Sequence, residues 1–77
     1  MESHSDCVYR WFAEHGFHLI YRSTAIRLMA HQELPGVEVR IGTVYVVVER
    51  DGKEIYRSLV REFDPSDVAA HVFSGSA

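Results

Sequence analysis

The first apolar residues of the chain recur at helical spacing. Positions i, i+3 and i+4 are occupied by Val8, Trp11 and Phe12, which predicts a helix over residues 5–15. Ser3 or Ser5 is available as the N-cap, and Asp6 suits the first turn. Gly16 then favours the end of the helix.

The same spacing returns at the other end of the chain. Asp64 and Pro65 are typical of the N-cap and first position of a helix, and Val68 and Val72 lie four positions apart. We therefore predict a final helix that begins after Asp64 and buries these two valines. We expect residues 74–77, which are small and mostly polar, to form a disordered tail.

Between the two predicted helices the pattern changes to alternation, which is typical of strands. Residues 17–22 alternate apolar and polar side chains and predict a strand. Residues 24–33 fit either a short helix or a second strand, of which we favour the strand. The sequence Leu-Pro-Gly at 34–36 then predicts a turn.

The segment 37–50 is rich in β-branched residues and changes its apolar phase once. Three of its apolar residues occupy odd positions and three occupy even ones: Val37, Val39, Ile41, Val44, Val46 and Val48. We interpret the change as a β-bulge at Gly42 within one strand, which would bring all six side chains onto one face.

Asp51 and Gly52 separate this segment from the next one. Asp-Gly is typical of a two-residue type I′ hairpin turn. The turn would pair these residues across the hairpin: Arg50 with Lys53, Val48 with Ile55, and Val46 with Arg57. The alternative is a helix within residues 53–63, because Asp51 and Glu54 fit a capping box and later apolar residues have helical spacing. We favour the hairpin, since a long strand needs an antiparallel neighbour.

The order of these elements predicts an α+β fold. We expect an antiparallel three- to four-stranded meander with an N-terminal and a C-terminal helix, both on one face. A chain of 77 residues is too short for two domains, so residues 1–73 are expected to form a single one.

The predicted hairpin register assigns the strand residues to two faces. One face is predicted to be the core, and its only polar members are Arg57 and Arg61. Its apolar members are Val37, Val39, Ile41, Val44, Val46, Val48, Ile55, Leu59 and Phe63. The centre of the opposite face carries two tyrosines and two valines, where a solvated sheet normally has polar residues: Tyr45, Val47, Tyr56 and Val60. Four glutamates surround them: Glu38, Glu49, Glu54 and Glu62.

Aromatic anchors inside a charged rim are typical of protein contact surfaces, so we predict that these eight residues bind a partner. Glu49 and Glu54 would face each other directly, and a cation from a partner would relieve their repulsion. The alternative is that Tyr45 and Tyr56 form a cross-strand pair that only stabilises the sheet.

Composition narrows the classes of function. The chain has 8 Lys and Arg against 11 Asp and Glu, a net charge of −3, which argues against direct binding of nucleic acid. A single cysteine, Cys7, favours a reducing cytoplasm and is interpreted as a small buried apolar residue. The five histidines lack zinc-site spacing, so we expect no metal and no cofactor. Neither a signal peptide nor the roughly 20-residue apolar stretch of a membrane helix is expected.

Two families of RNA-directed proteins share features with the chain. The short helix, Gly16-Phe17 and the strand 18–22 are similar to the opening of small mRNA-cleaving toxins of the HicA type, which implies ribonuclease activity. The turn that carries the catalytic histidine there is replaced by residues 23–25, Ser-Thr-Ala, so no catalytic residue carries over. The element order resembles a double-stranded-RNA-binding domain, but the acidic residues 64–67 stand where that family is rich in lysine.

These observations favour a non-enzymatic protein–protein interaction module. In size, acidity and lack of a catalytic motif, the chain resembles phage-encoded inhibitors of bacterial defence systems, anti-CRISPR proteins among them. The resemblance implies a larger protein or ribonucleoprotein partner whose nucleic-acid-binding or assembly surface is blocked. The alternatives are a small RNA-cleaving toxin and a homodimer formed through the same face.

Overall fold

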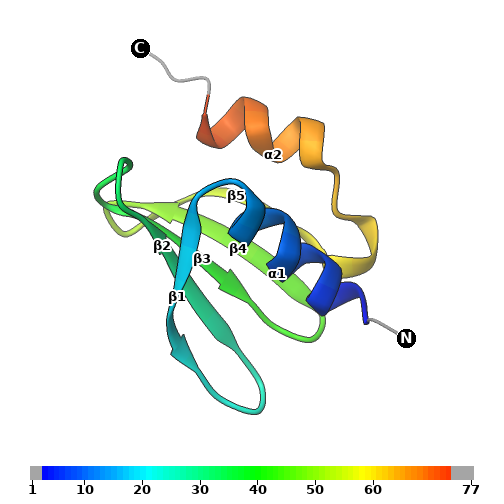
Figure 1. Ribbon diagram of the computed structural model, residues 1–77. Helices are drawn as coiled ribbons and strands as arrows, with labels where there is room; N and C mark the ends of the chain where they lie inside the picture. Colours follow the sequence, from blue (N-terminus) through cyan, green and yellow to red (C-terminus); the bar gives the residue numbers. More distant parts are fainter. Residues whose placement is uncertain (1–2, 74–77) are drawn as a thin grey trace.

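The computed structural model describes residues 3–73 and has an α+β fold built on one antiparallel sheet (Figure 1). Each strand pairs with its neighbours in the sequence, in the order β1-β2-β3-β4-β5. The strands are β1 (Phe17–Arg22), β2 (Arg27–His31), β3 (Val37–Ile41), β4 (Tyr45–Arg50) and β5 (Lys53–Leu59). The predicted meander with a helix at each end is confirmed, with five strands where the sequence predicted three or four. The predicted tail lies outside the described residues.

Helix α1 (His4–Glu14) lies one residue earlier than the predicted range 5–15, and its N-cap is Ser3, one of the two predicted candidates. Ser3 Oγ accepts a hydrogen bond from Asp6 N–H at 3.1 Å, and the Asp6 carboxylate accepts one from Ser3 N–H at 3.4 Å. This capping box satisfies two backbone donors that the first turn would otherwise leave unpaired. After the helix, Gly16 adopts a left-handed φ of 94°, and a Cβ atom there would collide with the His31 ring, so only glycine fits.

Helix α2 (Pro65–Val72) also begins as predicted. The Asp64 carboxylate accepts a hydrogen bond from Ser66 N–H at 3.0 Å, and Val68 and Val72 are buried. A short 3-10 helix, η1 (Val60–Glu62), connects β5 to α2. The helical alternative for residues 53–63 is therefore wrong except for this single turn.

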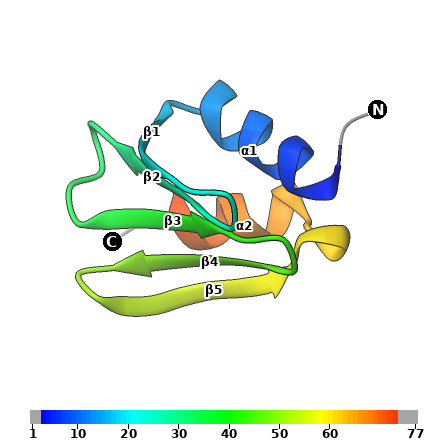
Figure 2. The same ribbon diagram turned by 90° about the horizontal axis from the view of Figure 1, so that it is seen from below.

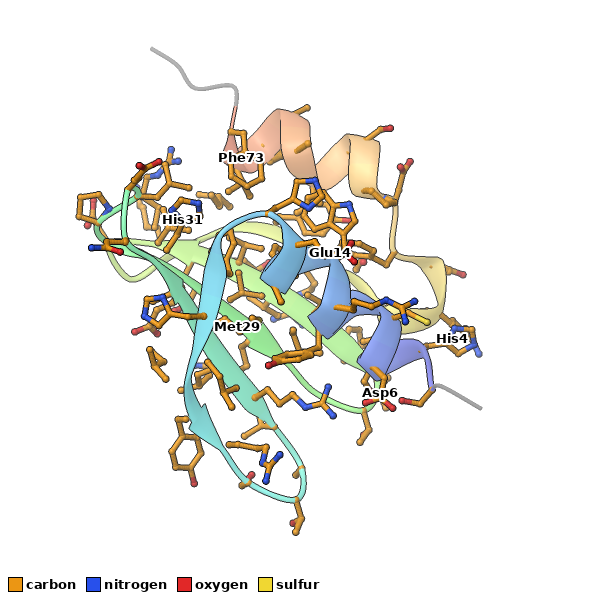
Figure 3. All side chains as sticks on the ribbon, in the orientation of Figure 1. His4, Asp6, Glu14, Met29, His31 and Phe73 are labelled. Atoms are coloured by element: carbon orange, nitrogen blue, oxygen red, sulfur yellow. The ribbon has the colours of Figure 1, made fainter. Side chains whose placement is uncertain are left out.

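Both helices lie on the same side of the sheet, and the core fills the space between the two layers (Figures 1 and 2). Met29 lies in the middle of this layer and is completely buried (Figure 3). Polar contacts join this side of the sheet to each helix. Arg27 Nη2 donates to Asp6 Oδ1 of α1 at 2.7 Å, and Arg50 Nη2 donates to the Val72 carbonyl of α2 at 3.3 Å. We call this side of the sheet the covered face.

The segment 37–50 is two strands and not one bulged strand. Gly42 N–H donates to the Tyr45 carbonyl at 2.9 Å and closes a tight turn between β3 and β4. Ile41, at an odd position, pairs with Val46, at an even position, across the hairpin. The turn therefore changes the apolar phase from odd to even positions, as a bulge would. Five of the six predicted side chains therefore still share the covered face, but Val44 lies in the turn and is 54% exposed.

The turn at Asp51 and Gly52 is confirmed, with φ values of 53° and 84° that are typical of type I′. Arg50 pairs with Lys53 as predicted, and Glu49 lies opposite Glu54. A bulge then shifts the register by one residue, so that the other two predicted pairs are wrong. Val48 pairs with Tyr56 and not with Ile55, and Val46 pairs with Ser58 and not with Arg57.

This shift exchanges the two faces of β5, because side chains alternate along a strand. Tyr56 points into the core and is 7% exposed, whereas Arg57 and Leu59 lie on the opposite side of the sheet. The assignment of Leu59 to the core is therefore wrong. The predictions for the first part of the sheet are confirmed, since 17–22 is β1, 24–33 contains β2, and 34–36 forms a turn with Gly36 at a φ of 86°.

Candidate protein-interaction surface

The side of the sheet that carries no helix is here called the open face. Strand register arranges its side chains in rows that cross the strands. The glutamate row, next to the turn at Asp51, consists of His18, Ala30, Glu38, Glu49 and Glu54. The central row consists of Tyr21, Leu28, Arg40, Val47 and Arg57. Beyond it, Tyr45 lies opposite Leu59.

Three carboxylates line up in the glutamate row. Glu38, Glu49 and Glu54 are direct partners on the adjacent strands β3, β4 and β5. Neighbouring strands are about 4.8 Å apart, so the three charges form a closely spaced line. Among residues 3–73, Glu38 and Glu49 form no ion pair.

Glu54 differs from the other two because a guanidinium neutralises it. Arg57 donates from Nε and Nη2 to the Glu54 carboxylate over 3.2 and 3.0 Å. These hydrogen bonds lower the pKa of Glu54 and raise the pKa of Arg57. The Arg57 guanidinium also lies over the Tyr45 ring, 5.5 Å from its centroid. Arg57 therefore links the glutamate row to the exposed tyrosine.

Apolar side chains occupy the middle of the open face. Val47, between Arg40 and Arg57, is only 8% exposed although no helix covers it. Tyr21 and Tyr45 are 54% and 48% exposed. A shallow hollow of about 280 Å³ adjoins Tyr45 and Val47 and extends to Ile26. An aromatic and aliphatic centre beside a charged row is typical of protein contact surfaces.

The structure brings five of the eight predicted contact residues together: Tyr45, Val47, Glu38, Glu49 and Glu54. Tyr56 and Val60 instead belong to the core on the covered side, where the Tyr56 ring lies 5.6 Å from the His71 ring of α2. Glu62 lies in η1, outside these rows. The placement of these three residues on the contact face is therefore wrong.

Sequence reasoning missed six members of the open face: His18, Tyr21, Leu28, Ala30, Arg57 and Leu59. One signal pointed to the error, because the predicted register placed Arg57 in the core. A shift of one residue moves Arg57 to the solvent and brings Tyr56 inward, which is the observed arrangement.

No group of three His, Cys, Asp or Glu side chains within residues 3–73 could hold a metal ion. Both ring nitrogens of His31 contact backbone groups, since Nε2 lies 3.1 Å from the His15 carbonyl and Nδ1 lies 3.1 Å from Glu33 N–H. Cys7 is exposed, so its interpretation as a buried residue is wrong. In the same residues, no helix is long and apolar enough to cross a membrane.

No family model, curated protein or solved structure matches this chain. Within the described residues, the open face is the feature on which we base a functional proposal.

Proposed function

We propose that the protein is a non-enzymatic interaction module whose open face binds a basic surface on a larger protein or ribonucleoprotein. The observation that supports the proposal is the glutamate row. Glu38 and Glu49 lie directly opposite each other and, within the described residues, neither has an ion-pair partner. Like charges so placed destabilise an isolated sheet, and cations from a partner would remove the repulsion.

A groove that binds nucleic acid has the chemistry that fits this row. Such grooves carry arginines and lysines spaced to neutralise a line of phosphates. Glu38 and Glu49, with Glu54 and its Arg57 partner beside them, offer a similar line of negative charge. Occupation of the groove would exclude the nucleic acid. The protein would then act as a phage-type inhibitor of a bacterial defence complex, like the anti-CRISPR class. The proposal places it in the cytoplasm, where such complexes act.

The apolar centre supplies the contact area that charges alone do not. Tyr45 keeps about half of its surface exposed, at 48%, and its ring is already held under the Arg57 guanidinium. Little side-chain entropy is then lost when the ring is buried in a complex. Tyrosine and arginine are also the residues most often found at the energetic centre of interfaces. We therefore expect Tyr45 and Arg57 to act together as the anchor.

The proposal is tested by affinity capture with a matched pair of charge variants. Wild type, Glu49→Lys and Glu14→Lys are immobilised and exposed to bacterial lysate that contains nucleic-acid-guided defence complexes. Glu14 is exposed on α1, away from the open face, so the two variants change the net charge equally. We expect wild type and Glu14→Lys to retain one stoichiometric protein, and Glu49→Lys to lose it.

Two further readouts decide between an inhibitor and other activities. Added nucleic acid should displace the captured partner, and higher salt should weaken the complex, because both compete for the same cations. Equal retention by Glu49→Lys and Glu14→Lys would contradict the role of the glutamate row. Degradation of RNA by the purified protein would replace the proposal with the toxin alternative.

A further inference from the structure

Two lines of opposite charge lie side by side on the open face. Glu38 and Arg40 are two residues apart on β3, the central strand of the sheet. Glu54 and Arg57 occupy the same two rows on β5, because the bulge adds one residue between them. Two residues along a strand span about 6.6 Å. The face is therefore negative along one row and positive along the next.

This pattern is complementary to itself under one particular symmetry operation. Consider a two-fold axis that lies in the interface, runs perpendicular to the strands and passes above Val39. It places Glu38 of each copy opposite Arg40 of the other copy. It also places Glu54 of each copy opposite Arg57 of the other copy. An axis parallel to the strands would instead place each row opposite itself, with Glu38 facing Glu38. Only the first arrangement brings opposite charges together.

We propose that the open face also binds a second copy of this chain in this antiparallel, face-to-face arrangement. The dimer would cover the surface that binds the partner, so self-association would regulate partner binding. This regulatory role rests on the proposed function, whereas the dimer itself rests only on the charge pattern of the face.

The middle of the face allows two sheets to approach. Packed sheets lie about 10 Å apart, a distance that a glutamate and an arginine can bridge from opposite sides. On β2, β3 and β4 the two charged rows carry no ring, because Tyr21 lies on the edge strand β1 and Tyr45 lies beyond the central row. The apolar residues there are buried or half-buried: Val47, Leu28 and Ala30. Glu49 would come opposite Val47 of the second copy, between the Arg40 and Arg57 side chains of that copy. All three glutamates would then lie beside a cation.

The size of the face indicates a weak and reversible dimer. Five strands about 4.8 Å apart, each about 18 Å long, give roughly 430 Å² for each copy and roughly 900 Å² for the pair. This is below the 1,200 Å² or so that stable interfaces bury. We therefore expect a dimer that forms at high concentration and gives way to a tighter partner.

The test uses the purified chain alone and measures its mass by sedimentation or light scattering from about 1 µM to about 1 mM, the range of weak affinities. The wild-type mass should rise from 8.8 kDa toward twice that value. Arg40→Glu and Glu38→Arg should each remain monomeric, because each places like charges opposite one another.

Charge reversal in both chains should restore the contact. An equimolar mixture of Arg40→Glu and Glu38→Arg should dimerise, since one chain then carries carboxylates at both positions and the other carries guanidiniums at both. The double variant Glu38→Arg/Arg40→Glu exchanges the two charges within one chain. Its association constant for the dimer should be at least about tenfold higher than that of either single variant.

Matched controls separate the dimer from general charge effects. Arg61→Glu and Glu14→Arg make the same changes of charge away from the open face and should dimerise like wild type. Circular dichroism of every variant checks that it is folded. A wild type that stays monomeric at about 1 mM would overturn the proposal, and so would a mixture that fails to dimerise while wild type does. Neither result affects partner capture, because that assay uses dilute protein on a surface, so the two proposals fail separately.

Discussion

The two faces of the sheet can be compared through the rows that cross their centres. On the covered face the central row is Leu19, Met29, Val39, Val48 and Tyr56, and Met29, Val39 and Val48 are completely buried. The central row of the open face has two arginines among its five members. Both rows belong to the same hydrogen-bonded ladder, so backbone structure does not distinguish them. The covered row stabilises the fold, whereas the open row remains available for contacts between molecules.

The largest expected difference between the faces comes from truncating one tyrosine on each. Tyr56→Ala should lower the free energy of unfolding by about 3–5 kcal/mol, because it removes a buried ring from beneath α2. Tyr45→Ala should lower it by less than about 1 kcal/mol, because the ring is 48% exposed. Urea denaturation of both variants measures the difference.

The loss from Tyr56→Ala would be a large part of the stability of a domain of this size, which is about 4–12 kcal/mol. Partial unfolding of this variant at body temperature is therefore expected. Similar losses for the two tyrosine variants would mean that the register of β5 differs from the one described, and would remove Tyr45 from the contact surface.

A smaller effect of opposite sign is expected in the glutamate row. Glu49→Gln should raise the free energy of unfolding by a few tenths of a kcal/mol, because it relieves repulsion with Glu38 and Glu54. The gain should disappear near 1 M salt, where the Debye length is about 3 Å. Denaturation at low protein concentration, with Glu62→Gln as the control outside the rows, measures it. A destabilised Glu49→Gln would show that the row is satisfied within the monomer.

The smallest expected effect is on the pH dependence of the free energy of unfolding. It compares one ion pair on each face of the sheet. Arg27 and the Ser3 cap lower the pKa of Asp6 on the covered side, and Arg57 lowers the pKa of Glu54 on the open face. A carboxyl whose pKa is lower in the folded state stabilises the fold above its unfolded pKa, which is about 4. That stabilisation is lost as the pH falls through the folded-state pKa.

Asp6→Asn and Glu54→Gln should therefore each have a lower free energy of unfolding than wild type at about pH 7. Near pH 2 the free energies of the variants and of wild type should converge. We expect the larger difference for Asp6, which has Ser3 as a second hydrogen-bonding partner. Urea titrations at several pH values measure both. A difference that persists in strong acid would show that the substitutions act through something other than the charged pair.

Local signals were sufficient for most of the elements. The Ser3 and Asp64 caps, the left-handed Gly16 and the Asp51-Gly52 turn each act within a few residues, so their sequence patterns predicted them correctly. The turn after Gly42 was missed because a tight turn and a bulge change the apolar phase in the same way. The candidate surface was predicted in part, since Tyr45, Val47 and three glutamates share a face as expected.

Patterns along the chain were enough to establish where most helices, strands and turns form, and that one side of the sheet would be apolar. Which residues of β5 face inward depended on packing in three dimensions. Alternation along a strand defines two sets of side chains but does not say which set is buried. Here the bulge at Ile55 lets the Tyr56 ring pack beneath α2, an element that follows in the chain, and the same step brings Arg57 out to Glu54 and Tyr45. The open face is therefore a product of long-range packing on the opposite side of the sheet.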